Sequence, residues 1–98
     1  MEFELPKKEE RKLTLKRPNV ADIKECRRKY LELESIDKNN LEELNLKTIA
    51  LTEWAIKVVC PELTEEELNK MDGEDYIKLS EEAIDLVSGA KFRKSAKN

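Results

Sequence analysis

Carboxylates are the side chains of this 98-residue chain that could carry acid–base or metal chemistry, because it contains 22 aspartates and glutamates and no histidine. Without histidine, neither a Ser-His nor a Cys-His nucleophile can be assembled, and the commonest general base is missing. Two acidic clusters remain, Glu65-Glu66-Glu67 and Asp72-Gly73-Glu74-Asp75. The first would have to act as an acid–base group and the second as a calcium loop.

Both clusters are better explained as helix starts. The three glutamates follow Thr64 at capping-box spacing, with no apolar neighbours to tune them for proton transfer. A calcium loop needs acids at alternate positions and glycine at the sixth, whereas Gly73 directly follows Asp72. Two glycines in the whole chain leave no phosphate-binding loop. We therefore expect a protein that is not an enzyme, with no catalytic residue, no cofactor and no metal site.

The thiols and the apolar residues indicate a cytoplasmic setting. Cys26 and Cys60 lie far apart, without metal-ligand spacing, and are interpreted as two reduced thiols. The chain has no run of 18 apolar residues, and its charged amino end lacks the apolar stretch of a signal peptide. We expect no contact with a membrane.

Charge is segregated along the chain, although the formal net charge is only −3. Residues 39–88 hold thirteen acids and four lysines, whereas residues 89–98 hold four basic residues and no acid. An acidic helical body argues against nucleic-acid binding, which usually requires a basic face. It is compatible with a protein that masks a basic partner, and equally with a need for solubility.

The segment 13–23 combines a strand, a stop and a helix start. Leu13 and Leu15 alternate with polar residues, as in a half-buried strand. Pro18 ends any strand pairing, and Asn19 with Asp22 has the spacing of a helix capping box. This order predicts a mainly α fold (α+β) in which an N-terminal two-stranded β-hairpin precedes three main helices and one short helical turn.

The expected elements follow from periodicity, caps and breakers. Residues 1–89 form one small domain, with the hairpin in 1–17 and helices in 20–88, and residues 90–98 form a basic tail outside the core. The predicted ranges are strands Glu2–Leu5 and Lys12–Lys16 joined by Pro6–Arg11, helices Val20–Ser35 and Leu41–Val59 (the latter starting as late as Leu46), a turn from Thr64 through Leu68 and Met71, and a helix from Asp72 to Val87 or Ser88 stopped by Gly89.

The two longest apolar patterns differ. In the last helix, one half is predicted to face the core and the other solvent; the core half contains Tyr76, Ile77, Leu79, Ala83, Ile84 and Val87, and the solvent half Lys78, Glu81, Glu82 and Asp85. The second helix is apolar almost all round, with only Glu53 and Lys57 as a polar strip. We expect it to be buried all round, either as the core helix of the domain or partly by another copy of the chain. Leu51, Trp54 and Val58 are the candidate protein-contact residues.

The order of a short hairpin, Leu-x-Leu-x-Arg-Pro-x-x-x-Asp and then helices resembles the small tail assembly chaperones of long-tailed bacteriophages. The residues that carry this pattern are Leu13, Leu15, Arg17, Pro18 and Asp22. The later stretch from Leu63 to Leu79, with Asp72, Asp75 and Tyr76, is similar to the family's second half. The resemblance covers roughly residues 3 to 88.

This resemblance implies a non-enzymatic chaperone that binds the tape-measure protein and keeps it soluble while the tail tube polymerises. The implied partners are the tape-measure protein and the tail tube protein, with self-association as a further expectation. The implied location is the host bacterial cytoplasm, without retention in the mature virion. In many relatives, a frameshift near the gene's end produces a longer form. The alternative function is a small acidic adaptor or inhibitor that masks a basic partner protein.

Overall fold

The computed structural model of the protein describes residues 2–4 and 12–90, and within these ranges the fold is mainly helical, as predicted. The elements are, in order, β1 (Glu2–Glu4), β2 (Lys12–Thr14), α1 (Val20–Glu34), α2 (Leu41–Val59), α3 (Glu65–Asn69) and α4 (Gly73–Val87). The three main helices and the short helical turn therefore lie where the caps and apolar patterns predict them.

The amino-terminal strands are short. β1 and β2 pair antiparallel, with Phe3 opposite Leu13. The predicted connection Pro6–Arg11 and the tail residues 91–98 lie outside the described residues. β2 ends at Thr14 rather than at Lys16, because the Lys16 amide donates a hydrogen bond of 2.6 Å to the Val59 carbonyl at the end of α2. The backbone after Thr14 therefore bonds to α2 instead of continuing the strand pair.

Reciprocal capping fixes where two of the helices begin. At α1, the Asp22 amide donates to Asn19 Oδ1 and the Asn19 amide donates to Asp22 Oδ2, both at 2.9 Å. At α3, the Thr64 and Glu67 pair repeats the arrangement at 3.0 and 3.1 Å. Each box satisfies two amides that would otherwise have no partner within the helix.

The end of α4 depends on a left-handed residue. Gly89 has a φ of +79°, a conformation that side chains disfavour, and its amide donates to the Leu86 carbonyl at 3.1 Å. The helix therefore stops after Val87, as the sequence predicts.

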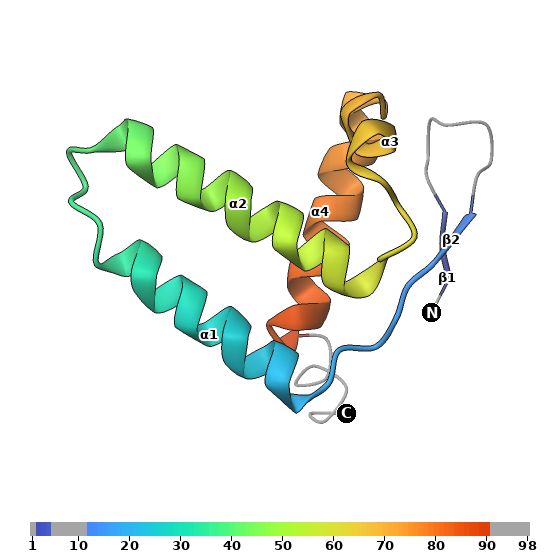
Figure 1. The fold of residues 1–98 in the computed structure, drawn as a ribbon, viewed down its shortest axis with the longest axis horizontal. Helices are drawn as coiled ribbons and strands as arrows, with labels where there is room; N and C mark the ends of the chain where they lie inside the picture. The colour runs from blue at the N-terminus through green and yellow to red at the C-terminus, as the bar shows by residue number, and fades with distance from the viewer. Residues whose placement is uncertain (1, 5–11, 91–98) are drawn as a thin grey trace.

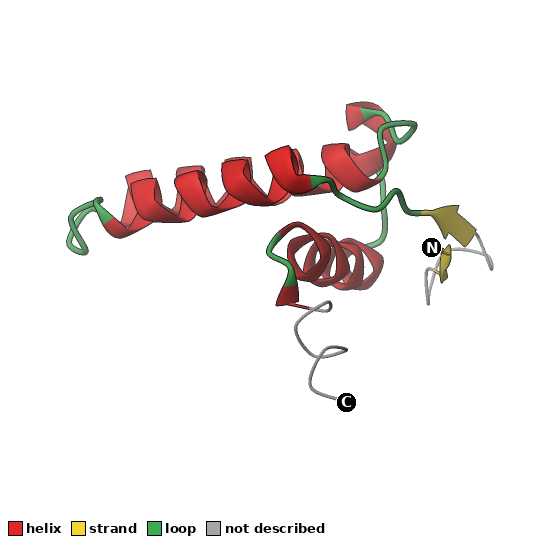
Figure 2. Ribbon diagram, turned by 90° about the horizontal axis from the view of Figure 1, so that it is seen from below, coloured by secondary structure: helices red, strands yellow, loops and turns green. Residues whose placement is uncertain are grey.

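The helices form an arm and a crossing layer (Figure 1). α1 and α2 run antiparallel as a helical hairpin, here called the α1–α2 arm. α4 crosses the carboxyl half of α2, which is its most extensive helix contact, and touches α1 less. Viewed from below, the far end of the arm extends beyond α4 (Figure 2).

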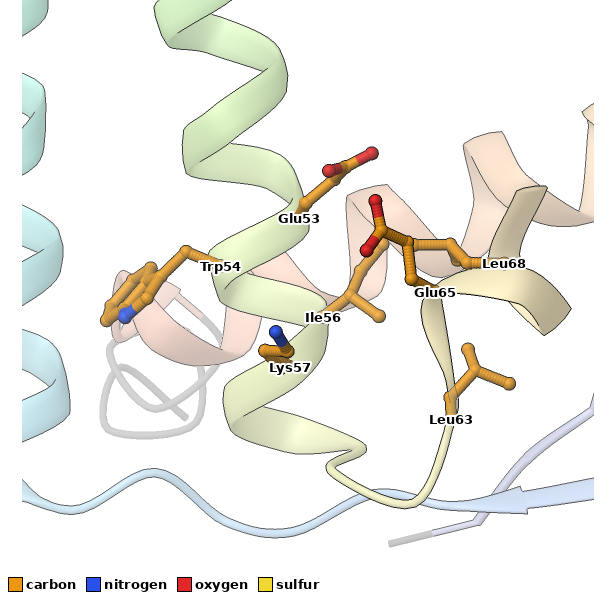
Figure 3. Close-up of a pocket in the computed structure, with 7 residues that line it drawn as sticks. All are labelled: Glu53, Trp54, Ile56, Lys57, Leu63, Glu65 and Leu68. Atoms are coloured by element: carbon orange, nitrogen blue, oxygen red, sulfur yellow. The ribbon is translucent and has the colours of Figure 1, made fainter.

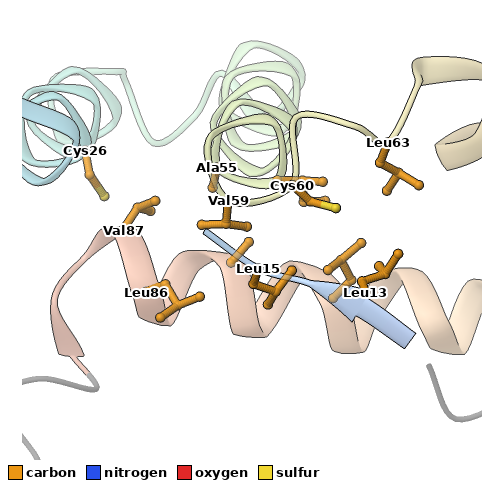
Figure 4. Packing of buried hydrophobic residues seen from close by; sticks show 12 residues of the cluster. Leu13, Leu15, Cys26, Ala55, Val59, Cys60, Leu63, Leu86 and Val87 are labelled. Carbon is orange, nitrogen blue, oxygen red and sulfur yellow. The ribbon is translucent and has the colours of Figure 1, made fainter. Parts of the chain in front are cut away.

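The core sits where α2 crosses α4 (Figure 4). Leu13 of β2 and Leu15 just after it enter the core, and they are 3% and 1% exposed. The buried cluster is completed by residues from α1, α2, α4 and the connection after α2: Cys26, Ala55, Ile56, Val59, Cys60, Leu63, Leu79, Ala83, Leu86 and Val87. A segment with little secondary structure therefore supplies two of the main core side chains.

The buried face of α4 is rotated from the predicted one. Leu79, Ala83 and Val87 are buried as predicted, but Ile77 is 59% exposed, so its assignment to the core half is wrong. At 3.6 residues per turn, Ile77 lies about 160° around the helix from Leu79. Leu86 and Asp75 are fully buried as well. Asp75 lies in the first turn of α4, where the helix dipole favours negative charge.

Two leucines of identical chemistry test this distribution of burial. Leu15→Ala is expected to lower the free energy of unfolding by about 2–5 kcal/mol, because it leaves a cavity in the core. Leu46→Ala, at a position 61% exposed on α2, is expected to change it by less than about 0.5 kcal/mol. Urea unfolding followed by circular dichroism measures both, and equal costs would contradict the core described here.

Candidate protein-interaction surface

The surroundings of α2 change halfway along the helix. Its carboxyl half contains all four of its buried residues, Leu51, Ala55, Ile56 and Val59. In its amino half, Leu46 is 61% and Ile49 is 50% exposed. The expectation that the domain buries this helix all round is wrong, because α4 crosses only the carboxyl half and α1 covers only one side. Apolar side chains are left uncovered on the arm.

The three candidate contact residues do not lie on that uncovered surface. Leu51 is 4% exposed and, with Leu33 and Ala50, lines a small pocket of about 90 Å³ between the arm helices. Trp54 and Val58 are partly buried and pack against the core. Leu51 therefore cannot offer an exposed contact in this conformation, and the contact role of Trp54 and Val58 stays a prediction.

Trp54 joins the two helices of the arm. The Lys29 ammonium lies 5.3 Å from the centroid of the indole ring, which is cation–π distance. The same ammonium lies 3.5 Å from Glu25 Oε2. Trp54 thus holds α1 against α2, although it also lines the pocket described below.

The basic run Arg27-Arg28-Lys29 does not form a patch of unpaired positive charge. The Arg28 guanidinium forms ion pairs with both Glu25 and Glu32 on its own helix. The hydrogen bond from Arg28 lowers the pKa of the Glu25 carboxyl, and the same bond raises the pKa of Arg28. These pairs are exposed, so they contribute little to stability, but they occupy charges that a nucleic acid would need.

The two thiols lie in the interior and the described residues contain no disulfide between them. Cys26 is 1% exposed and Cys60 is fully buried. Burial raises the pKa of the Cys26 thiol, which keeps it in the protonated form that is a poor nucleophile. Their environment is that of core residues.

A pocket of about 300 Å³ lies between α2 and α3 (Figure 3). Ile56 from α2 and Leu63 before α3 are buried, and Leu68 of α3 is partly buried against them. Glu53 and Glu65 point outward at the same end of the pocket, one from each helix. Lys57 and Trp54 complete the lining.

The exposed residues Leu46 and Ile49 lead along α2 toward this pocket, where Ile56 is buried. Leu46, Ile49, Glu53 and Ile56 follow one another at steps of three, four and three residues, which places them on one face of α2. We call these four residues the α2 stripe. The stripe and the α2–α3 pocket share Glu53 and Ile56, so together they form one surface, here called the contact groove. Sequence periodicity showed the apolar face, but only the crossing of α4 shows that it is uncovered.

The residues that carry the family pattern have architectural roles. Leu13 and Leu15 fill the core, and Asp22 completes the α1 capping box. Pro18 precedes the helix cap, and Arg17 is exposed. The pattern therefore records how the amino segment is attached to the helices rather than a contact site.

Within residues 2–4 and 12–90, none of the helices is long and apolar enough to span a membrane. No group of three or more potential ligands among His, Cys, Asp and Glu is placed to hold a metal ion within the same ranges.

Comparison with known proteins identifies the family. Residues 3–88 match the family described as "Phage tail assembly chaperone proteins, E, or 41 or 14". No match is found among curated proteins or among solved structures. Because the match covers most of the chain, the protein belongs to this family of phage tail assembly chaperones. The resemblance seen in the sequence is confirmed.

Family membership has consequences for function. It supports a chaperone role in tail assembly and implies interaction with tail proteins. It also implies action in the host cell during assembly, by a protein whose role is not enzymatic. The contact groove is one partly apolar surface that the fold offers for such an interaction.

The contact between Lys29 and Trp54 can be tested by a double-mutant cycle. Lys29→Met keeps the aliphatic stem and removes the charge, and Trp54→Leu removes the ring. We expect a coupling free energy of about 0.5–1 kcal/mol between the two changes, as for other cation–π pairs. Unfolding in urea gives the four stabilities. Strictly additive effects would show that the ammonium and the indole do not stabilise the arm.

Proposed function

We propose that this protein binds the tape-measure protein of its phage and keeps it soluble while the tail tube polymerises around it. The tail tube protein is the second proposed partner. The proposed place of action is the host bacterial cytoplasm, and the protein is absent from the finished virion. The family match supports the general role; the partner and the mechanism are our proposal.

The observation that carries the proposal is the uncovered apolar side of α2. Leu46 is 61% exposed and Ile49 is 50% exposed, and both lie on an arm that extends past the core. A stretch of adjoining apolar surface on a soluble protein commonly marks a contact with another protein. A client with exposed apolar side chains would cover it and would itself be protected from aggregation.

The charges of the chain suit this task. Residues 39–88 carry thirteen acids against four lysines. Net negative charge favours solubility, so a complex coated with this body would resist association with other complexes. One surface then binds the client while the remaining surface keeps the complex in solution.

Co-expression tests the proposed function. The tape-measure protein encoded in the same phage genome is produced in bacteria with and without this chain, and its soluble fraction is measured after centrifugation. We expect it to aggregate alone and to remain soluble, bound to the chaperone, when both are present. A matched control replaces this chain by an unrelated acidic protein of similar size and charge.

Two outcomes would contradict the proposal. The tape-measure protein could be equally soluble with the control protein, which would reduce the effect to charge alone. Alternatively, the chain could capture basic host proteins and leave the tape-measure protein insoluble, as expected of an acidic adaptor or inhibitor. Mass spectrometry of purified virions provides a further check, and stoichiometric retention of this chain would exclude a transient role.

A further inference from the structure

We propose that the contact groove binds an amphipathic helix whose apolar seam is flanked by lysine or arginine side chains. This inference rests on the proposed function, since we assign the helix to the tape-measure protein. It adds the residues that make the contact and the chemistry of the segment that is recognised.

The apolar part of the groove has the shape of a helix-binding site. The α2 stripe, whose one polar member is Glu53, spans eleven residues from Leu46 to Ile56, and their ten steps correspond to about 15 Å at 1.5 Å per residue. Beside its carboxyl end, Leu63 and Leu68 form the second wall of the pocket of about 300 Å³. An apolar seam with side chains at steps of three and four residues would meet this surface over about three turns.

The charges on the groove specify what flanks the seam. Glu53 and Glu65 approach the same end of the pocket from α2 and α3 (Figure 3). Among residues 2–4 and 12–90, no hydrogen bond or ion pair involves either side-chain carboxylate. With Lys57 as the one basic residue of the lining, the two carboxylates give the pocket a net negative charge that a lysine or arginine from a partner would complement.

The same charges disfavour a second copy of this chain as the occupant. The outward side of α4 carries Glu81, Glu82 and Asp85 with Lys78, and the first turn of α2 carries Glu42 and Glu43. These faces of another copy would therefore bring more negative charge to Glu53 and Glu65. The α1 helix of another copy carries four acids and four basic residues, and its Arg28 and Lys29 already form ion pairs with Glu25 and Glu32 of the same helix. A helix with basic flanks is the complementary occupant.

Synthetic helices test the proposal on the full 98-residue chain. A fluorescein-labelled 18-residue peptide has leucines at steps of three and four residues, flanked by lysines, and a matched peptide has glutamates in place of the lysines. Fluorescence anisotropy measures binding to the wild-type protein. We expect the lysine peptide to bind about tenfold or more tightly than the glutamate peptide at low salt, with a difference that shrinks as salt is added.

Substitutions on the protein locate the site. Leu46→Glu is expected to weaken binding of the lysine peptide by about tenfold or more, because it replaces an exposed apolar contact residue by a charged one. Leu31→Glu is the matched control, because Leu31 is 65% exposed on α1 and lies outside the groove. The double variant Glu53→Lys with Glu65→Lys should reverse the preference between the two peptides. Circular dichroism confirms that each variant is folded.

Several results would overturn the proposal. Equal loss of binding in Leu31→Glu and Leu46→Glu would place the site elsewhere or show that binding is unspecific. Tighter binding of a peptide of residues 90–98 at the groove would make the chain's own basic tail the occupant. A concentration-dependent dimer in sedimentation that Leu46→Glu disrupts, together with no peptide binding, would make it a second copy.

The co-expression assay separates this inference from the proposed function. If Leu46→Glu and the charge-reversed variant still keep the tape-measure protein soluble, the function stands and the groove assignment is wrong. If the wild-type chain fails to keep it soluble, the proposed function is wrong even where the lysine peptide binds. The expected result is that both groove variants lose solubilisation and Leu31→Glu retains it.

Discussion

The crossing of α2 over α4 is the contact on which the rest of the structure depends. α2 has 19 residues, which gives it a length of about 28 Å, and α4 covers only its carboxyl half. There, Ala55 and Val59 are fully buried, together with Leu79 and Ala83 of α4. A helix longer than the layer it packs on must leave one end uncovered, and here that end exposes Leu41, Leu46 and Ile49.

The other elements adapt to this crossing. Leu13 and Leu15 fill the space beside it, and the amide of Lys16 is anchored to the last carbonyl of α2. α1 packs along one side of α2, where Lys29 lies over Trp54. The short α3 forms the second wall of the pocket next to Ile56. One side of the amino half of α2 remains without a partner in the described chain, and the contact groove consists of that side and the pocket.

Local features of the fold could be predicted from the sequence because they depend on neighbouring residues. The capping pairs of Asn19 with Asp22 and of Thr64 with Glu67 form between residues three apart, and Gly89 ends α4 through its own backbone. The period of the leucines likewise indicated that Leu13 and Leu15 would be buried. The predicted tail lies outside the described residues.

The candidate site could be predicted only in part, because it depends on where helices cross. A helical projection shows apolar residues around most of the carboxyl part of α2, but it cannot tell that Leu51 faces the interior while Leu46 and Ile49 face solvent. It also misplaced Ile77, since the rotation of α4 is set by tertiary packing against α2. Trp54 is a candidate contact residue in the sequence, yet its indole contacts Lys29 on the neighbouring helix of its own chain. The uncovered residues beside it are the better candidates.

Hydrogen exchange followed by mass spectrometry tests the central claim most directly, with the protein measured alone and in its complex with the tape-measure protein. The central claim is that the amino half of α2 is an exposed surface that a client helix covers. In the isolated protein, amides near 55–59 should exchange much more slowly than those near 41–50, because only the former lie in the core. In the complex, residues 42–57 and 63–68 should gain protection. Protection gained only on α1 or on the outward side of α4, with residues 42–57 unchanged, would contradict the account.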